Sequence, residues 1–133
     1  MEYQNPALAV DAAVRCNDTV LLIQRGNEPW KGAWALPGGF VEYGEDPHDA
    51  VLRELEEETG LKGTIIRLLD ARGNPERDPR KHIVSIVYLV EAEGEPIGGD
   101  DAADARFWPI DAVLNGELEI AGDHTEILRD WLG

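Results

Sequence analysis

Residues 38–61, GGFVEYGEDPHDAVLRELEEETGL, constrain this chain more than any other stretch. Asp46 is a suitable N-cap, Pro47 suits the first position of a helix, and Gly60 can take the left-handed conformation that ends one. These signals predict a helix that starts at Pro47, stops before Gly60 and follows a pair of glycines. The stretch therefore predicts a short glycine turn joined to one long, well-capped helix.

The predicted helix carries an acidic cluster that stability alone would not select. At about 100° per residue its inward face holds Val51, Leu52, Leu55 and Thr59. Glu54, Glu57 and Glu58 lie beside that face, where like charges cost about 0.2–0.5 kcal/mol per pair and the helix dipole disfavours anions. A divalent cation would turn this repulsion into ligation, and carboxylate oxygens suit Mg²⁺, Mn²⁺ or Ca²⁺. The alternative interpretation is a solvated acidic face on an acidic protein.

The full spacing favours the metal-binding interpretation. Gly39 is followed after five residues by Glu45, and after seven more by the run RELEEETGL, which starts at Arg53. This pattern resembles the Nudix box at every specified position. The resemblance implies an α/β/α sandwich and an enzyme that uses Mg²⁺ or Mn²⁺ to hydrolyse a nucleoside diphosphate linked to a further group X.

The same resemblance implies a role for Gly39 and for the charged residues of the box. Glu54, Glu57 and Glu58 would be metal ligands, together with the carbonyl oxygen of Gly39. Arg53 would orient the glutamates by ion pairing. Glu45 would hold the geometry between the loop and the helix rather than take part in the chemistry.

Other parts of the chain resemble the compact ADP-ribose pyrophosphatases of the Nudix superfamily. These parts are NEPWKGAWALPGGFVEYGE, NPERDPRKHIVSIVYL and AGDHTEIL. The resemblance implies hydrolysis of ADP-ribose to AMP and ribose 5-phosphate. One alternative is a house-cleaning hydrolase of oxidised nucleoside triphosphates, and a second is a ligand-sensing Nudix domain without catalysis. Because related ADP-ribose hydrolases are often homodimers, the resemblance also allows a homodimer.

A basic loop stands out in a chain whose formal charge is −15. Residues 71–82, ARGNPERDPRKH, carry four of the 12 basic side chains, including Arg77 and Arg80. Arginine forks match phosphate geometry, so the loop is interpreted as a clamp for an anionic substrate; the alternative is a loop that balances acidic neighbours. Arg25, at the end of a predicted strand, is a third candidate for contact with substrate phosphate, or simply an exposed strand-end charge.

The overall charge and length exclude several classes of protein. With 27 acidic against 12 basic side chains, the chain is not expected to bind nucleic acid or anionic membranes. Its 133 residues predict one domain, residues 1–133, and its single cysteine excludes an internal disulfide. There is no signal peptide and no apolar run of about 20 residues, so a cytoplasmic location is expected. The Nudix resemblance implies a small nucleotide as the partner.

The remaining elements predict an α+β fold. Strands are expected at residues 7–16, 19–24, 64–70, 83–90 and 105–109, and short helices from residue 110 and from residue 123, with Asp123 as the cap of the last. The box helix and the C-terminal helix would cover the two sides of a mixed sheet. The catalytic base is left open between a box glutamate and the loop acids Glu95, Asp100, Asp101 and Asp104. His82 and His124 are interpreted as structural histidines or polar contacts.

Overall fold

The computed structural model describes residues 3–99 and 102–133, so the base candidates Asp100 and Asp101 lie outside the described residues. Within these ranges the strands are β1 (Ala7–Ala13), β2 (Arg15–Cys16), β3 (Thr19–Arg25), β4 (Trp34–Ala35), β5 (Gly38–Phe40), β6 (Thr64–Arg72), β7 (Ile83–Glu91) and β8 (Ala102–Pro109). The helices are α1 (Pro47–Thr59), α2 (Ile110–Leu114) and α3 (His124–Leu132).

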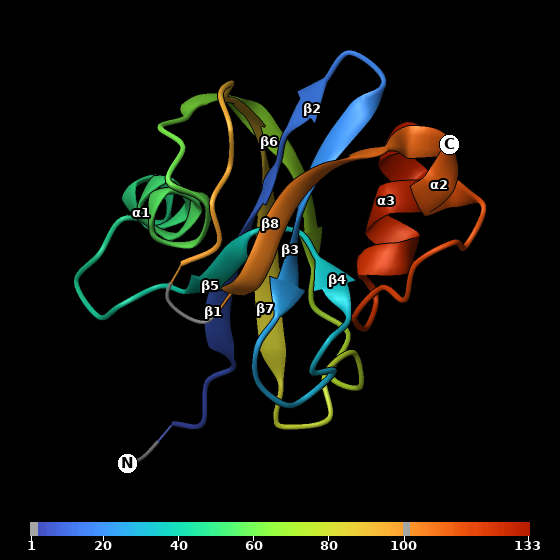
Figure 1. The fold of residues 1–133 in the computed structure, drawn as a ribbon. Coiled ribbons are helices and arrows are strands. Elements are labelled where there is room, and N and C mark those ends of the chain that lie inside the picture. Colours follow the sequence, from blue (N-terminus) through green and yellow to red (C-terminus); the bar gives the residue numbers. More distant parts are fainter. Residues whose placement is uncertain (1–2, 100–101) are drawn as a thin grey trace.

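The strands lie between α1 on one side and α2 with α3 on the other (Figure 1). One sheet has the order β5-β1-β7-β6, in which β1 and β7 are parallel and the other pairs antiparallel. In the second sheet β3 pairs with β2, β4 and β8. The predicted α+β class, with strands of mixed direction between the box helix and the C-terminal helix, is confirmed; the strands form two sheets rather than one.

Alternation along β1 determines which layer each of its side chains meets. Val10 and Ala12 belong to the core cluster that includes α1, whereas Ala13 belongs to the cluster that includes α3. Asp11 alternates with Ala12 and therefore faces the α3 side, where it is buried. The one charged residue in this apolar strand thus points between the layers rather than to solvent.

The box helix begins and ends as its sequence predicts. The Asp46 carboxylate accepts a hydrogen bond from the His48 backbone N–H, and Pro47 occupies the first helical position. Gly60 ends the helix with φ at 75°. Of the residues expected on the inner face, Val51, Leu55 and Thr59 are buried and Leu52 is half-buried. Local signals therefore sufficed for α1.

Two predicted strands differ from the observed ones. The strand expected over residues 7–16 is interrupted at Val14, because β1 lies in one sheet while β2 pairs with β3 in the other. The last strand starts at Ala102 rather than Ala105, because it follows β3 as far as the pair Arg25–Ala102. Both differences come from pairing with distant strands, which a local pattern does not contain.

The expected cap of the last helix has another role. Asp123 stands at the N-cap position of α3 but makes no side-chain cap hydrogen bond. Its carboxylate instead accepts two hydrogen bonds from Arg77, each of 2.8 Å. Asp123 therefore stands at the predicted N-cap position, but its side chain joins α3 to the basic loop instead of capping the helix.

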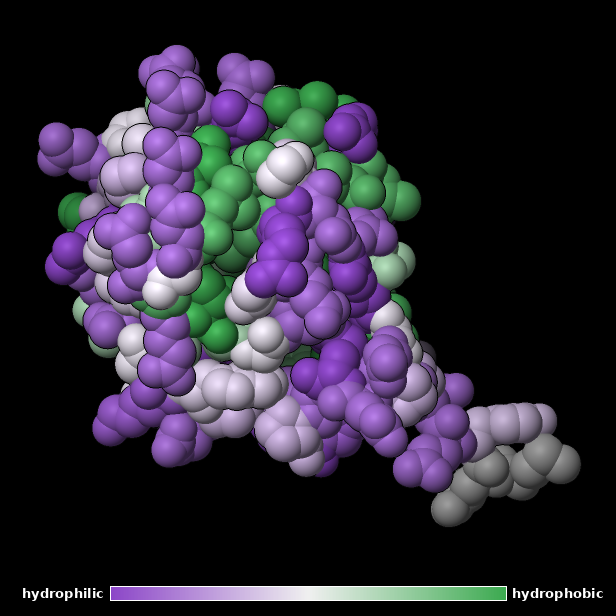
Figure 2. Space-filling view, turned by 90° about the vertical axis from the view of Figure 1, so that its right-hand side faces the viewer, coloured by the Kyte–Doolittle hydropathy of each residue, from purple (hydrophilic) through white to green (hydrophobic). Residues whose placement is uncertain are grey.

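The face that carries α2 and α3 is mostly covered by hydrophilic side chains, and apolar ones gather in its upper part (Figure 2). Among the described residues, no helix is both long enough and apolar enough to cross a membrane.

Candidate active site

A cavity of about 460 Å³ brings most of the predicted site together. From the box it is lined by Gly39, Glu54 and Glu58, and from elsewhere in the chain by Arg25, Arg77 and Arg80. Arg53 and Glu57 do not line it. The box residues and the predicted substrate arginines therefore face one space, although Arg25 and Arg80 are 55 positions apart in the sequence.

The two glycines of β5 are required because carboxylates approach the backbone there. A β-carbon at Gly39 would lie 2.5 Å from Glu54 Cδ and 2.6 Å from both of its oxygens. A β-carbon at Gly38 would collide with the Val10 carbonyl and the Asp11 carboxylate, since Asp11 is the direct strand partner of Gly38. The Gly38 N–H donates a hydrogen bond of 2.7 Å to Glu58 Oε1. Only glycines allow this close approach.

Arg53 connects the acidic side chains of the box. Its Nε and Nη2 donate to the two oxygens of Glu45 at 2.8 and 2.9 Å, and Nη1 donates to Glu54 at 2.9 Å and to Glu57 at 3.1 Å. Nη2 also donates to the Phe40 carbonyl at 3.2 Å. The hydrogen bonds from Arg53 lower the pKa of Glu45 to about 2 and raise the pKa of Arg53 itself. These contacts are those that an orienting arginine requires.

The donor set suits a hard divalent cation. The Glu54 carboxylate lies against Gly39, and the Glu58 carboxylate is held at Gly38, so two ionisable oxygen ligands meet the glycine backbone at the cavity wall. Carboxylate and carbonyl oxygens are the ligands that Mg²⁺ and Mn²⁺ prefer. Glu57 is turned toward Arg53 instead. Within residues 3–99 and 102–133, no three metal-binding side chains are already gathered around one point.

The three predicted substrate arginines differ in how their donors are used. Arg77, whose side chain is 7% exposed, donates to both oxygens of Asp123, to Ser85 Oγ at 3.1 Å and to the Ile83 carbonyl at 3.4 Å. All of its guanidinium nitrogens are thus engaged within the protein. Arg77 therefore fastens the basic loop to β7 and to the start of α3.

Arg80 is more exposed than Arg77 and also lines the cavity. Its side chain is 41% exposed, pairs with Asp78 and stands 5.6 Å from the centre of the Phe40 ring. Lys81 approaches the same ring at 5.2 Å. Arg25 donates from Nε to the Pro29 carbonyl at 2.7 Å and also lines the cavity. Arg25 and Arg80 thus border the same space, and Arg80 binds Asp78 through Nε and Nη2.

The loop candidates for the catalytic base lie away from this cavity where they are described. Glu95 is exposed and does not line it. Asp104 does not line it either and pairs with Arg106 at 2.8 Å. The box glutamates Glu54 and Glu58 are the predicted base candidates that border the space.

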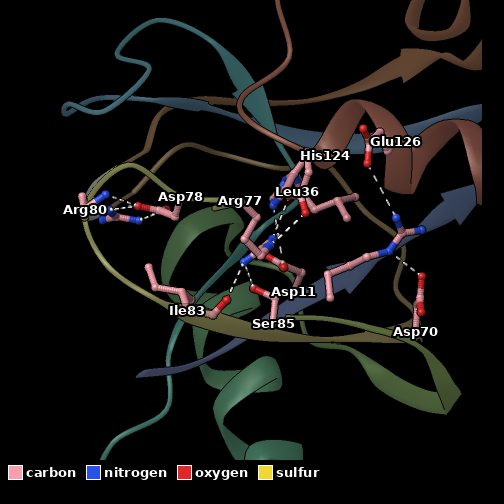
Figure 3. A network of polar contacts seen from close by, with 12 residues as sticks. Asp11, Leu36, Asp70, Arg77, Asp78, Arg80, Ile83, Ser85, His124 and Glu126 are labelled. Atoms are coloured by element: carbon pink, nitrogen blue, oxygen red, sulfur yellow. Dashed lines mark hydrogen bonds and ion pairs between the residues drawn. The ribbon is translucent and has the colours of Figure 1, made fainter. Parts of the chain in front are cut away.

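A buried polar network lines the cavity beside the box, and sequence reasoning mostly missed it (Figure 3). Asp11, Ser85 and His124 line the cavity beside the Arg77–Asp123 pair. Burial raises the pKa of Asp11, against the lowering effects of His124, Arg77 and a hydrogen bond from Ser85. One signal was present in the sequence, namely a lone aspartate within an apolar strand. His124, interpreted as a structural or polar-contact histidine, accepts a hydrogen bond from the Leu36 N–H.

Known proteins resemble the chain over nearly its whole length. The NUDIX domain family matches residues 5–131. An ADP-ribose pyrophosphatase of Methanocaldococcus jannaschii is 45% identical over 131 residues, which are 98% of this chain and 75% of that protein. The NUDIX domain of Shewanella oneidensis NrtR in complex with ADP ribose is 32% identical, with a TM-score of 0.86 over 98% of this chain and 91% of that one.

A third similar structure contains a metal ion. It is a bifunctional NMN adenylyltransferase/ADP ribose pyrophosphatase from Francisella tularensis, complexed with AMP and a Mn ion. It is 31% identical, with a TM-score of 0.83 over 99% of this chain, which spans 42% of that larger chain.

Proposed function

The chain belongs to the Nudix family and is a Nudix hydrolase, and from this premise we propose that it hydrolyses ADP-ribose to AMP and ribose 5-phosphate. The observation that carries the proposal is the shared cavity, in which the box carboxylates Glu54 and Glu58 face the same space as Arg25 and Arg80. The resemblance to an archaeal ADP-ribose pyrophosphatase and to a domain bound to ADP ribose supports this substrate.

The box would hold Mg²⁺ or Mn²⁺ through Glu54, Glu57, Glu58 and the Gly39 carbonyl. Such an ion, when bound, neutralises diphosphate charge and lowers the pKa of a coordinated water. The Mn ion in the similar Francisella structure supports this cofactor. Arg53 contributes by holding Glu54 and Glu57, which restricts their rotamers before the ion arrives.

In the reaction, a water oxygen bonds to one phosphorus of the diphosphate while the bridging bond from that phosphorus to oxygen breaks. The water proton passes to a carboxylate, and the leaving phosphate departs as an anion. We assign the proton acceptor to Glu54 or Glu58, because both carboxylates border the cavity whereas Glu95 and Asp104 do not. A box glutamate is therefore preferred over these two loop acids as the base.

Arg25 and Arg80 would contact the phosphate oxygens, since fixed cations stabilise the charge that develops during the displacement. Arg77 would act indirectly, because its nitrogens already bind Asp123, Ser85 and Ile83. Its role is then to hold the basic loop, and Arg80 with it, over the cavity.

The deciding experiment is turnover of ADP-ribose with Mg²⁺ or Mn²⁺, with AMP and ribose 5-phosphate identified by chromatography. We expect activity that EDTA abolishes and added metal restores. A parallel assay with 8-oxo-dGTP addresses the triphosphate alternative, and a kcat/KM at least about tenfold higher for 8-oxo-dGTP would overturn the assignment. Tight ADP-ribose binding without any turnover would instead favour a ligand-sensing domain.

The expected setting is a cytoplasmic enzyme of one domain, residues 1–133, with a small nucleotide as its partner. A formal charge of −15 supports the expectation that it binds neither nucleic acid nor an anionic membrane. A homodimer is tested by light scattering on the purified chain, with a mass of about 29 kDa expected from twice 14.7 kDa.

A further inference from the structure

The wall of the cavity beside the box contains a carboxylate oxygen that lacks a hydrogen bond among the described residues. Asp11 is 6% exposed, and its Oδ2 is fully buried without a partner among the described residues. Buried polar atoms are almost always hydrogen-bonded, so an exception in a ligand cavity requires an explanation. Its other oxygen lies against Gly38, directly across the strand pair from the box backbone.

The proton position of His124 follows from its contact with the backbone. The Leu36 N–H donates to His124 Nδ1 at 3.0 Å, so the neutral imidazole carries its proton on Nε2. That Nε2 lies 3.7 Å from Asp11 Oδ2, which is too far for a hydrogen bond between them. A donor on His124 and an acceptor on Asp11 therefore face each other across a gap (Figure 3).

We propose that Asp11 and His124 form a subsite for one ribose hydroxyl of the substrate, which accepts from Nε2–H and donates to Oδ2. An oxygen about 2.8 Å from each atom fits a separation of 3.7 Å. A hydroxyl is the substrate group that donates and accepts through a single atom. Oδ2 has no exposed surface in this structure, so the subsite requires the Asp11 carboxylate to turn about its Cβ–Cγ bond, a soft torsion, when the hydroxyl enters.

The charges around this subsite favour a neutral group over a phosphate. The Asp11 and Asp123 carboxylates both stand on this wall and would repel a phosphate, while Arg77 is occupied by Asp123. The arginines that border the cavity at other points, Arg25 and Arg80, belong to β3 and the basic loop. The inference rests on the proposed function. It adds that Asp11 and His124 recognise a ribose hydroxyl, which distinguishes a ribose from other groups attached to a diphosphate.

The hydroxyl has two possible sources, the adenosine ribose and the terminal ribose, and product analogues distinguish them. Binding to the Mg²⁺-loaded protein is measured by calorimetry for AMP against its 2′-deoxy and 3′-deoxy forms. Ribose 5-phosphate is compared in the same way with its 2-deoxy and 3-deoxy forms. We expect one missing hydroxyl to weaken binding about tenfold, because it leaves buried polar atoms unpaired.

The same measurements on Asp11→Ala and His124→Phe identify the residues responsible. In either variant the penalty for that hydroxyl should fall below about twofold, whereas Asp111→Ala, an exposed residue of α2, should retain it. Thermal unfolding checks that each variant folds. Because the two variants lie on different elements, one can still test the subsite if the other fails to fold. An unchanged penalty in a folded variant, or no penalty for any ribose hydroxyl in the wild type, would overturn the subsite. Absence of ADP-ribose turnover in the wild type would instead contradict the proposed function.

Discussion

The Glu54 carboxylate occupies the space into which a side chain at Gly39 would project. A β-carbon there would lie 2.5 Å from Glu54 Cδ, well inside any allowed contact. The helix carboxylate and the strand backbone can therefore meet only because residue 39 has no side chain. The proposed metal site therefore requires a glycine at position 39 for steric reasons.

Gly39→Ala should displace Glu54 and reduce activity by about a hundredfold, since shifts near 1 Å in a catalytic group have effects of this size. Turnover of ADP-ribose and metal binding by calorimetry are the measurements. Gly73→Ala is the matched control, because its β-carbon would meet only the Val84 side chain, at 3.3 Å or more. Full activity in Gly39→Ala would show that Glu54 need not occupy its observed position.

Glu58→Gln and Glu57→Gln should lower kcat by about a hundredfold or more, because each removes the charge of a proposed metal ligand while keeping its shape. In Glu58→Gln the new amide oxygen can still accept the hydrogen bond that the Gly38 N–H makes to Glu58. The unfolding temperature should therefore change little. Glu56→Gln, on the exposed side of the same helix, is the control. Unchanged turnover in both variants would refute the ligand assignment.

Glu45 should contribute stability that depends on pH. Arg53 lowers the pKa of Glu45 from 4.5 to about 2, so this contribution is fully present above pH 4.5 and is lost as pH falls toward 2. Carbon-13 NMR of the Glu45 carboxyl should give a midpoint near 2. In Glu45→Gln, the corresponding part of the loss of stability between pH 4.5 and pH 2 should disappear. A midpoint near 4.5 would mean that the Arg53 pairing is absent in solution.

Substitution of Arg77 should mainly lower stability, whereas substitution of Arg80 should mainly weaken substrate binding. Arg77→Met leaves the Asp123 carboxylate, 17% exposed, without its partner and should lower the free energy of unfolding by about 3–5 kcal/mol.

Arg80→Met is the matched comparison: Arg80 is 41% exposed, and its partner Asp78, which is 8% exposed, keeps the hydrogen bond from the backbone N–H of residue 80. The free energy of unfolding should therefore fall less than in Arg77→Met. Arg80→Met should instead raise KM for ADP-ribose about tenfold with a small change in kcat. Urea unfolding and steady-state kinetics measure both quantities. The reverse ranking, with Arg80 stabilising and Arg77 affecting only KM, would contradict these roles.

Much of the fold could be predicted because its signals are local. The capped helix α1, the strand over residues 83–90 and the start of α2 all follow from neighbouring residues. The break between β1 and β2 could not, because it arises where the chain leaves one sheet for the other. Asp123 illustrates the same limit, since its position suits a helix cap while its partner, Arg77, lies 46 residues away.

The sequence by itself determined the box, with its glutamates on one helix face, its glycine stop and its orienting arginine, because spacing along a helix converts directly into direction. It also indicated that basic side chains gather in one loop. Only the tertiary structure decided that Arg77 is buried against Asp123 while Arg80, paired with Asp78, stays partly exposed beside the cavity. It also decided that Asp11 faces His124, whose ring binds the backbone of a residue 88 positions earlier. Such contacts depend on how whole layers pack, and no local periodicity encodes that packing.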